Sequence, residues 1–271
     1  MHSIIIGKNS NLSIHLSAKL DNCVVVSARD VYSDINILSS FKDKKINIIF
    51  NNFQPAVELN SLTSSTQYIN NSIVSTAKVL EYFEKSNINK IIYTSSSSVY
   101  GNNILCSEDD ELKPMNLHAS LKVANEKLIE KFSIEHKIDY TIARVFNMYG
   151  GDDNFSIISK IIKAVKNNEQ ITIVNNGNAI RDFIHIDDVV DVYTKLLEIK
   201  KLKIVNVGTG NGSSIKNILD FLHNNNINIR TKNIQREELK ISTADNNLLL
   251  KYAHKNSFKN IEDYLVKELN I

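Results

Sequence analysis

Thr94-Ser-Ser-Ser-Ser-Val-Tyr-Gly101 is the most informative segment of this chain of 271 residues. The apolar run at residues 91–94 leads into it, and four serines then end that run. A short apolar run bounded by turn-forming residues is typical of a buried strand in a parallel sheet. The segment therefore predicts a strand whose carboxyl end carries a row of hydroxyl groups.

Similar apolar runs lie on both sides of this strand, and segments of helical length separate them. Strands are predicted at residues 4–6, 24–26, 46–50 and 140–145, and helices at 76–83 and 123–132. Alternation of strands and helices is typical of a doubly wound α/β sheet with helices on both faces. Beyond Tyr149 the pattern changes to helices at 155–165 and 188–197, a strand at 171–174, and a helix capped by Ser213 and Ser214.

The composition argues against several classes of partner. The formal net charge is +2, which is too small to predict nucleic-acid binding. No apolar run approaches the roughly 20 residues that a membrane-spanning helix needs. Cys23 and Cys106 lack the spacing of metal ligands. We therefore expect a cytoplasmic protein with free thiols that binds no nucleic acid, membrane or metal.

Three further strings follow the serine run in a fixed order: His118-Ala-Ser-Leu-Lys122, Arg144-Val-Phe-Asn-Met-Tyr-Gly150 and Arg181-Asp-Phe-Ile-His-Ile-Asp-Asp188. In this order they resemble the extended short-chain dehydrogenase/reductases, which include nucleotide-sugar epimerases, dehydratases and ketoreductases. The resemblance implies an α/β fold with a Rossmann-type cofactor domain at residues 1–145 and about 180–207. It also implies a smaller C-terminal substrate-binding lobe at 146–179 and 208–271.

His118 stands where this family has its catalytic tyrosine, four residues before the lysine. The resemblance implies that Ser96 holds the reacting oxygen, that His118 handles the proton, and that Lys122 positions the nicotinamide ribose. Tyrosine titrates near about 10 and histidine near about 6.5 in model peptides, so histidine already suits proton transfer near neutrality. Three outcomes stay open: histidine replaces tyrosine, the enzyme is weak, or the chain binds ligands without turnover.

His118, Lys122 and Glu126 are spaced four residues apart. Residues at this spacing share one face of a helix, so the three side chains are predicted to align. Taken alone, the spacing is more often that of a charged stripe facing solvent.

The first predicted turn, Ile4-Ile-Ile-Gly-Lys-Asn-Ser-Asn-Leu-Ser13, stands at the place of the family's G-x-x-G-x-x-G. Gly7 is retained, and Ser10 and Ser13 replace the other two glycines. The resemblance assigns cofactor contacts to Gly7, Ser10, Asn11 and Leu12, because the N–H groups of a helix N-terminus attract pyrophosphate. The alternative is an ordinary capped turn without a ligand. After the third strand, Asn51-Asn52-Phe53 replaces small residues that usually line the cofactor cleft.

The second strand lacks the usual acidic residue at its end, and Arg29 follows it. An arginine suits a 2′-phosphate, so the sequence favours NADP over NAD as the cofactor. The alternative is that Arg29 is a solvated surface charge. Asp34 and Ile35 resemble the family's acidic–aliphatic pair beside the adenine.

The remaining strings predict a site for a nucleotide-diphosphate sugar. The resemblance assigns contacts with the sugar or its diphosphate to Ser97, Asn147, Arg181 and Arg236. Arginine suits phosphate because its guanidinium donates two parallel hydrogen bonds. Arg181 has a structural alternative, an ion pair with Asp187 or Asp188.

The resemblance therefore implies an NAD(P)-dependent oxidoreductase that acts on a nucleotide-activated sugar. The early loops resemble those of 4-ketoreductases of deoxysugar biosynthesis, so we expect 4-keto reduction. A nucleotide-sugar 4-epimerase is the first alternative, and a catalytically impaired nucleotide-sugar or dinucleotide binding protein is the second. Apolar stripes on two predicted helices also allow a homodimer, although core packing explains them equally well; the stripes are Ile73, Ala77 and Leu80 on one helix and Leu121 and Leu128 on the other.

Overall fold

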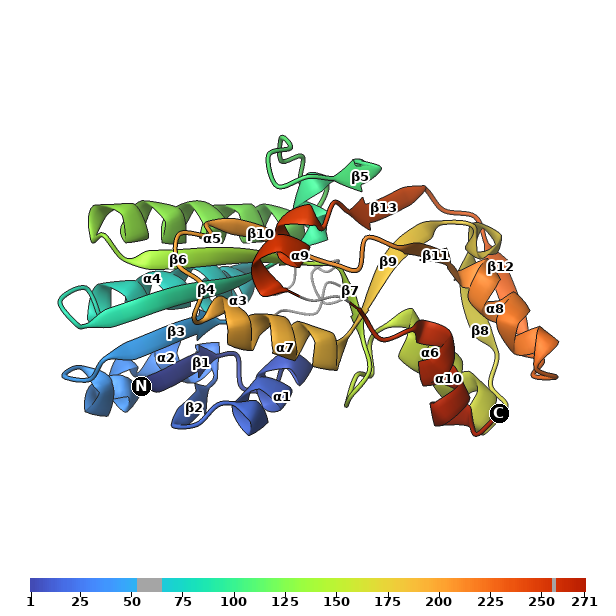
Figure 1. Cartoon of the computed structure of the whole chain (residues 1–271), viewed down its shortest axis with the longest axis horizontal. Helices are drawn as coiled ribbons and strands as arrows, with labels where there is room; N and C mark the ends of the chain where they lie inside the picture. Colours follow the sequence, from blue (N-terminus) through green and yellow to red (C-terminus); the bar gives the residue numbers. More distant parts are fainter. Residues whose placement is uncertain (53–64, 255–256) are drawn as a thin grey trace.

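The structure is a computed structural model that describes residues 1–52, 65–254 and 257–271. Its centre is a six-stranded parallel sheet with the order β10-β6-β4-β3-β1-β2 (Figure 1). The strands are β1 (His2–Ile6), β2 (Cys23–Val26), β3 (Ile46–Phe50), β4 (Ile88–Ser96), β6 (Asp139–Val145) and β10 (Ile204–Val207). The predicted doubly wound parallel sheet is confirmed.

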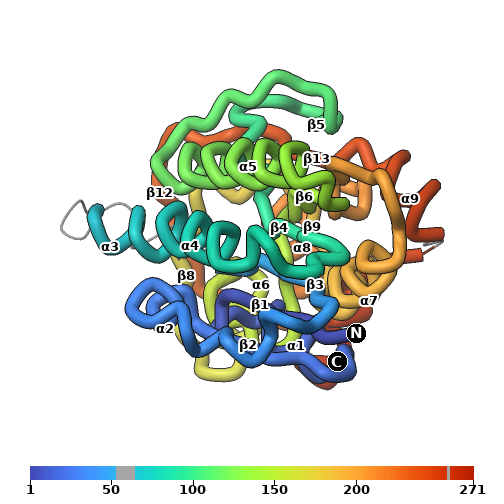
Figure 2. The backbone as a smooth tube through the Cα atoms, turned by 90° about the vertical axis from the view of Figure 1, so that its left-hand side faces the viewer, coloured from blue at the N-terminus to red at the C-terminus, as the bar shows by residue number. Residues whose placement is uncertain are grey.

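Helices cover both faces of the sheet (Figure 2), so apolar residues of the strands are buried on both faces. Ile5 packs on one face and its neighbours Ile4 and Ile6 pack on the other, since successive side chains of a strand alternate. The first face is covered by α1 (Asn11–Lys19), α7 (Ile186–Leu196) and α9 (Asn247–Ala253). The second is covered by α2 (Ala28–Ser33), α4 (Ser75–Tyr82) and α5 (Leu117–Glu135).

The strand order reverses between β1 and β3, which are neighbours in the sheet. In open parallel sheets the loops at such a reversal diverge, and the crevice at the carboxyl ends of the strands binds the ligand. The carboxyl ends of these strands face the second part of the molecule in Figure 1. The sheet therefore places the first turn and the serine run at one edge.

The second part of the molecule has its own apolar core, formed mainly by helices around a two-stranded sheet. Its elements are α6 (Ile157–Asn167), β8 (Ile171–Val174), α8 (Ile215–Asn224), β12 (Thr231–Ile234) and α10 (Ile261–Leu269). A further sheet joins it to the first part, with the order β11-β9-β13-β5 and with β7 paired to β9. Its strands are β5 (Leu105–Cys106), β7 (Asn147–Tyr149), β9 (Ile180–His185), β11 (Gly212–Ser214) and β13 (Ile241–Ala244).

Short helical segments complete the described part of the chain. They are η1 (Ile35–Phe41), α3 (Ser65–Ile69), η4 (Asn70–Val74), η5 (Ser97–Tyr100) and η6 (Asn175–Gly177). Among the described residues, no helix is long and apolar enough to cross a membrane, and no cluster of three acidic, cysteine or histidine side chains offers a metal site.

The predicted division of the chain into two parts stays a prediction, and α9 qualifies it. Leu249 and Ala253 of α9 lie in the core of the large sheet, against Leu196 of α7 and Val205 of β10. The predicted second lobe, residues 208–271, thus contains a helix that packs on the first part.

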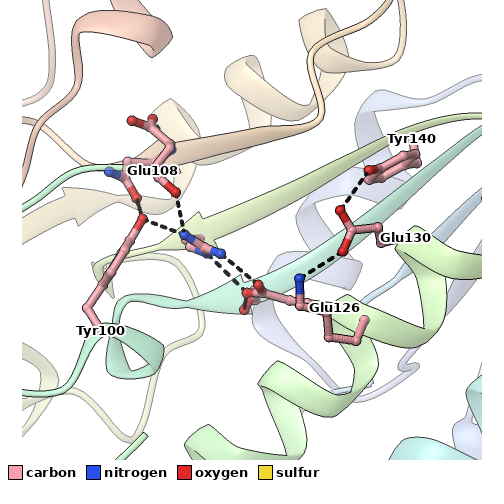
Figure 3. A network of polar contacts seen from close by, with 9 residues as sticks. Tyr100, Glu108, Glu126, Glu130 and Tyr140 are labelled. Atoms are coloured by element: carbon pink, nitrogen blue, oxygen red, sulfur yellow. Dashed lines mark hydrogen bonds and ion pairs between the residues drawn. The ribbon is translucent and has the colours of Figure 1, made fainter. Parts of the chain in front are cut away.

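A buried ion pair fastens α5 to the sheet (Figure 3). Arg144 of β6 donates to both carboxylate oxygens of Glu126, at 3.2 and 2.8 Å, and both side chains are almost fully buried. The Ser95 hydroxyl donates to the same carboxylate. Arg144 also donates to the Tyr100 hydroxyl at 3.0 Å and to the carbonyl oxygen of Glu108 at 3.1 Å. The pair thus joins α5 to β4, β6 and η5.

Glu126→Ala should lower the free energy of unfolding by roughly 3–5 kcal/mol, because Arg144 would stay charged in the interior without its carboxylate. Glu135, on the same helix, pairs with Lys131 at the surface, so Glu135→Ala is the control and should leave the unfolding midpoint nearly unchanged. Urea titration followed by circular dichroism measures both. Equal effects of the two substitutions would show that the buried pair does not hold the helix.

Candidate active site

Lys122 reaches from α5 to the carboxyl end of β4. Its Nζ donates to the carbonyl oxygen of Thr94 at 2.6 Å and lies 5.1 Å from the centre of the Tyr93 ring. Ser96 ends the same strand two residues later, and Ser97 begins η5. The structure therefore brings the predicted serine run and Lys122 to the same strand end.

The Ser96 hydroxyl is oriented by its own turn. Its oxygen accepts hydrogen bonds from the Ser98 N–H at 3.2 Å and the Ser98 hydroxyl at 3.0 Å. A serine oxygen has two lone pairs, so the Ser96 proton remains to be donated to a third group. Ser96 is half-buried, which leaves it accessible to a ligand. This arrangement suits the predicted role of holding a reacting oxygen.

His118 lies on α5 one turn before Lys122, and the two side chains are 9% and 5% exposed. Burial and, to a smaller extent, the charge of Lys122 together lower the pKa of His118 to about 4. Burial also lowers the pKa of Lys122 to about 8, against the opposing effect of Glu126. Near neutral pH the site therefore holds a neutral imidazole beside an ammonium that is mostly charged.

The predicted alignment of His118, Lys122 and Glu126 on one face of α5 is confirmed in part. All three are buried, so the alternative of a solvent-facing stripe is wrong. Glu126, however, directs its carboxylate to Arg144 and Ser95. Its influence on Lys122 is through its charge, which raises the lysine pKa.

Gly7 follows β1 at a position where only glycine fits. Its φ is +133°, and a Cβ atom there would stand 2.1 Å from the carbonyl oxygen of Asn51. Ser10 caps α1 by accepting the Ser13 N–H at 3.2 Å. The Asn51 amide then donates to the hydroxyls of Ser10, at 2.6 Å, and Ser13, at 2.8 Å. The two serine side chains, held by Asn51, thus stand in the space that two further glycines would leave open.

The first turn of α1 nevertheless fits a pyrophosphate. The Ser10 oxygen already accepts two hydrogen bonds, so its proton is left to donate to a phosphate. The N-terminal N–H groups of the helix supply further donors. The Leu12 side chain is buried in the core, so only its backbone can contact a cofactor as predicted.

Asn11 joins this turn to the loop after β7, a contact that the sequence did not predict. Its Nδ2 donates to the carbonyl oxygen of Gly150 at 2.8 Å, and its Oδ1 accepts the Asp152 N–H at 3.1 Å. The two segments are 139 residues apart in the chain. The cofactor turn and the segment beside Asn147 are therefore held together.

The residues predicted at the adenosine end lie around α2 and η1. Arg29 is exposed and lines a surface pocket with Tyr32, Ser33, Thr66, Gln67, Asn70 and Asn71. Asp34 caps η1 by accepting the Asn36 N–H at 2.9 Å, and Ile35 packs against the core beneath. Asn51 and Asn52 are buried, and Phe53 lies outside the described residues.

The predicted substrate residues lie on β7, on β9 and in the segment before β13. Asn147 donates to the carbonyl oxygen of Asp182 at 3.1 Å. Arg181 pairs with Glu238 at 3.3 Å. The structural alternative for Arg181, a pair with Asp187 or Asp188, is wrong, because these carboxylates bind the side chain and the backbone N–H of Lys259. The Arg236 side chain is exposed.

Other residues of the four strings support the structure around the site. The Tyr100 hydroxyl donates to Asn206 at 2.6 Å in the interior. Asp182 is fully buried and accepts hydrogen bonds from the backbone of Thr209, Gly210 and Ala244. His185 caps α7. Some residues of the four strings therefore support the fold and would not contact a ligand.

A pH titration of His118 tests the electrostatics of the site. The ring should stay neutral as the pH falls to about 4, because burial and the Lys122 charge both disfavour the imidazolium. Lys122→Met should move the His118 midpoint upward. Histidine ring nitrogen NMR measures both midpoints, and an identical midpoint in the two proteins would contradict the coupling.

The family model of the NAD dependent epimerase/dehydratase family matches residues 11–208. Protein CapI of Staphylococcus aureus is 31% identical over 172 residues, which are 62% of this chain and 51% of that protein. The ADP-L-glycero-D-manno-heptose-6-epimerase of Brachyspira hyodysenteriae is 32% identical over 201 residues, or 70% of this chain and 62% of that protein. The chain spans about half the length of several curated relatives that it matches, Protein CapI among them.

Solved structures share the fold over the whole chain. MoeE5 in complex with UDP-glucose and NAD has a TM-score of 0.89 at 21% identity, and the match covers 100% of this chain and 98% of that one. UDP-glucuronic acid 4-epimerase from Bacillus cereus, in complex with UDP-glucuronic acid and NAD, has a TM-score of 0.86 at 21% identity, with 100% and 98% covered. The family match over residues 11–208, which is more than half of the chain, shows that the chain belongs to the NAD-dependent epimerase/dehydratase family.

Proposed function

We propose that this chain catalyses NAD-dependent oxidation and reduction at C4 of a nucleotide-activated sugar, with 4-epimerisation as the net reaction. The family match and the epimerases among the relatives and solved structures support this class of reaction. The observation that carries the proposal is the convergence of Lys122 with the end of β4, where the Ser96 hydroxyl has a proton to donate.

The residues of this site account for the proton side of such a reaction. NAD, when bound, supplies the acceptor and donor of the hydride at the sugar carbon. The Ser96 hydroxyl holds the sugar oxygen, and neutral His118 accepts the proton of the sugar hydroxyl. The pKa of about 4 makes neutral His118 a weaker base than an ordinary histidine and makes its protonated form a better acid, so the return of the proton to the carbonyl oxygen is the easier of the two transfers. Lys122 keeps its charge beside this group and holds the cofactor ribose.

Most of the residues proposed to contact the substrate lie at or in the second part of the molecule. Asn147 and Arg181 lie on neighbouring strands, β7 and β9, and Arg236 lies in the segment before β13. Ser97 lies beside Ser96 at the strand end. We propose that these residues bind the sugar and the diphosphate of the substrate.

Reduction of a 4-keto sugar, which the early loops favoured, is kept as the alternative outcome. It uses the same residues and differs in consuming a reduced cofactor at every turnover. An epimerase regenerates its cofactor and needs no added reductant, so the requirement for a reductant separates the two.

A binding protein without turnover is a second candidate, and the first turn is the observation that favours it. The side chains of Ser10 and Ser13, held by the Asn51 amide, stand where two glycines of the family pattern would leave space for a dinucleotide. Such a protein would bind a nucleotide sugar and interconvert nothing, because hydride transfer needs the dinucleotide.

The predicted homodimer stays a prediction. Leu121, on the predicted stripe, packs against Tyr68, Ile73 and Leu117 of the same chain. Leu80, on the other stripe, is buried in the main core. Packing within the chain therefore explains much of the stripes on which the dimer was predicted.

Turnover of UDP-glucose, UDP-N-acetylglucosamine and UDP-glucuronate with NAD and no reductant tests the proposal. His118→Ala should reduce kcat by roughly 10²–10⁴-fold, because a general acid–base group is lost. His223→Ala, which changes an exposed histidine of α8, is the control and should leave kcat unchanged. Chromatographic separation of the epimers gives the rates. A full rate in His118→Ala would remove the histidine from the mechanism.

Cofactor choice is tested at Arg29. We propose NAD, because the family is NAD-dependent and NAD is bound in MoeE5 and in the Bacillus cereus epimerase. Arg29→Ser should weaken NADP binding and leave NAD binding unchanged, because only NADP carries a 2′-phosphate. Isothermal titration calorimetry of wild type and variant with both dinucleotides gives the four affinities. If NADP binds the wild type more tightly than NAD, the choice of NAD is wrong.

A further inference from the structure

Arg181 lies on a polar row that crosses three strands. β9 runs between β11 and β13, and Arg181 is paired with Ser213 on one side and with Ser242 on the other. Directly paired residues of neighbouring strands project from the same face of a sheet. The guanidinium is therefore flanked by two serine positions, on a side chain that is only 20% exposed.

The guanidinium already holds an anion from its own chain. Its Nη2 lies 3.3 Å from Oε2 of Glu238, which is 19% exposed, and its Nη1 donates to the carbonyl oxygen of Ile180 at 2.9 Å. Burial lowers the pKa of Arg181, and the Glu238 charge opposes this shift. A half-buried cation is costly without a negative partner, so the site requires a negative group whether or not a ligand is present.

Glu238 is held in place from the other side by Asn175 of η6. The Asn175 amide donates to Oε1 of Glu238 at 3.1 Å and to the carbonyl oxygen of Arg236 at 2.6 Å. Its own side-chain oxygen accepts the Arg236 N–H at 3.1 Å. The segment between β12 and β13 is therefore fixed to η6 and to β9, and its carboxylate is directed to the guanidinium.

We propose that Glu238 is the resident counter-ion of Arg181 and that a phosphate of the nucleotide diphosphate replaces it on binding. The inference rests on the proposed function for the identity of the ligand. Glu238 then sets the affinity for the diphosphate: the ligand must break an existing ion pair before it can use Arg181. Neutral ligands cannot replace the carboxylate, so the pair also selects for anionic ligands.

Removal of the negative charge of Glu238 should therefore tighten the binding of a nucleotide diphosphate. Glu238→Gln keeps an oxygen for Arg181 and Asn175 but abolishes the competing negative charge. A partly exposed ion pair is worth roughly 0.2–1 kcal/mol, so the affinity for UDP should rise by roughly 1.4- to fivefold. Glu237→Gln changes the net charge equally at the next residue, which is exposed, and is the matched control.

Isothermal titration calorimetry with UDP, with ADP and with inorganic pyrophosphate measures the effect on the full chain, without cofactor. The proposal expects tighter binding in Glu238→Gln and no change in Glu237→Gln. It also expects no gain from Glu238→Gln when Arg181→Gln is present, because the carboxylate acts through that guanidinium. Equal or weaker binding in Glu238→Gln, or failure of wild type and variant to bind any of the three probes, overturns the proposal.

The outcome is distinguishable from failure of the proposed function. If the wild type epimerises a UDP-sugar while Glu238→Gln binds UDP no better than Glu237→Gln, the counter-ion proposal is wrong and the function stands. If Glu238→Gln gains affinity while no sugar is turned over, the counter-ion proposal stands and the enzymatic function is wrong.

Discussion

The bidentate contact between Arg144 and Glu126 is the interaction on which the arrangement of the site depends. It joins the middle of α5 to β6 in the interior, where water cannot substitute for either partner. Lys122 lies one helical turn from Glu126, and Ser95, which bonds the same carboxylate, adjoins Ser96. The position of the ammonium relative to the hydroxyl is therefore set by a pair that touches no ligand. Such a pair is expensive to desolvate, and it fixes one orientation of α5.

The main sheet was predictable because its signals are local. The strands at residues 46–50 and 171–174 begin and end as predicted, since mostly apolar runs are bounded there by polar residues. α5 begins at Leu117, where Asn116 caps it, and therefore includes His118 and Lys122, as their predicted alignment with Glu126 requires; the helix range predicted from the apolar residues began only at residue 123. A periodicity of apolar residues misses helices whose inward face is polar.

The contacts that define the site were less predictable, because they join residues far apart in the chain. Asn51 and Ser10 are separated by 41 positions, and Arg181 and Glu238 by 57. The sequence marked Asn51 as a departure from the family pattern, which was the available signal, but not the partners of its amide. Nothing in the sequence indicated that Glu238 would pair with Arg181, because its charged segment contains other carboxylates of the same kind. Pairings of this kind are decided by tertiary packing, which local propensity does not describe.

Asn11 couples the N-terminus of α1 to the loop that follows β7. One amide side chain holds both the first turn of α1 and the loop at Gly150 and Asp152. Any displacement of that loop is transmitted to the helix terminus where a dinucleotide would sit, and the reverse holds equally. A variant whose loop is adapted to a different sugar must keep the two hydrogen bonds of Asn11, or must change the loop and the helix terminus together. Changes on the proposed substrate side are thus constrained by the position of the helix that is proposed to hold the cofactor.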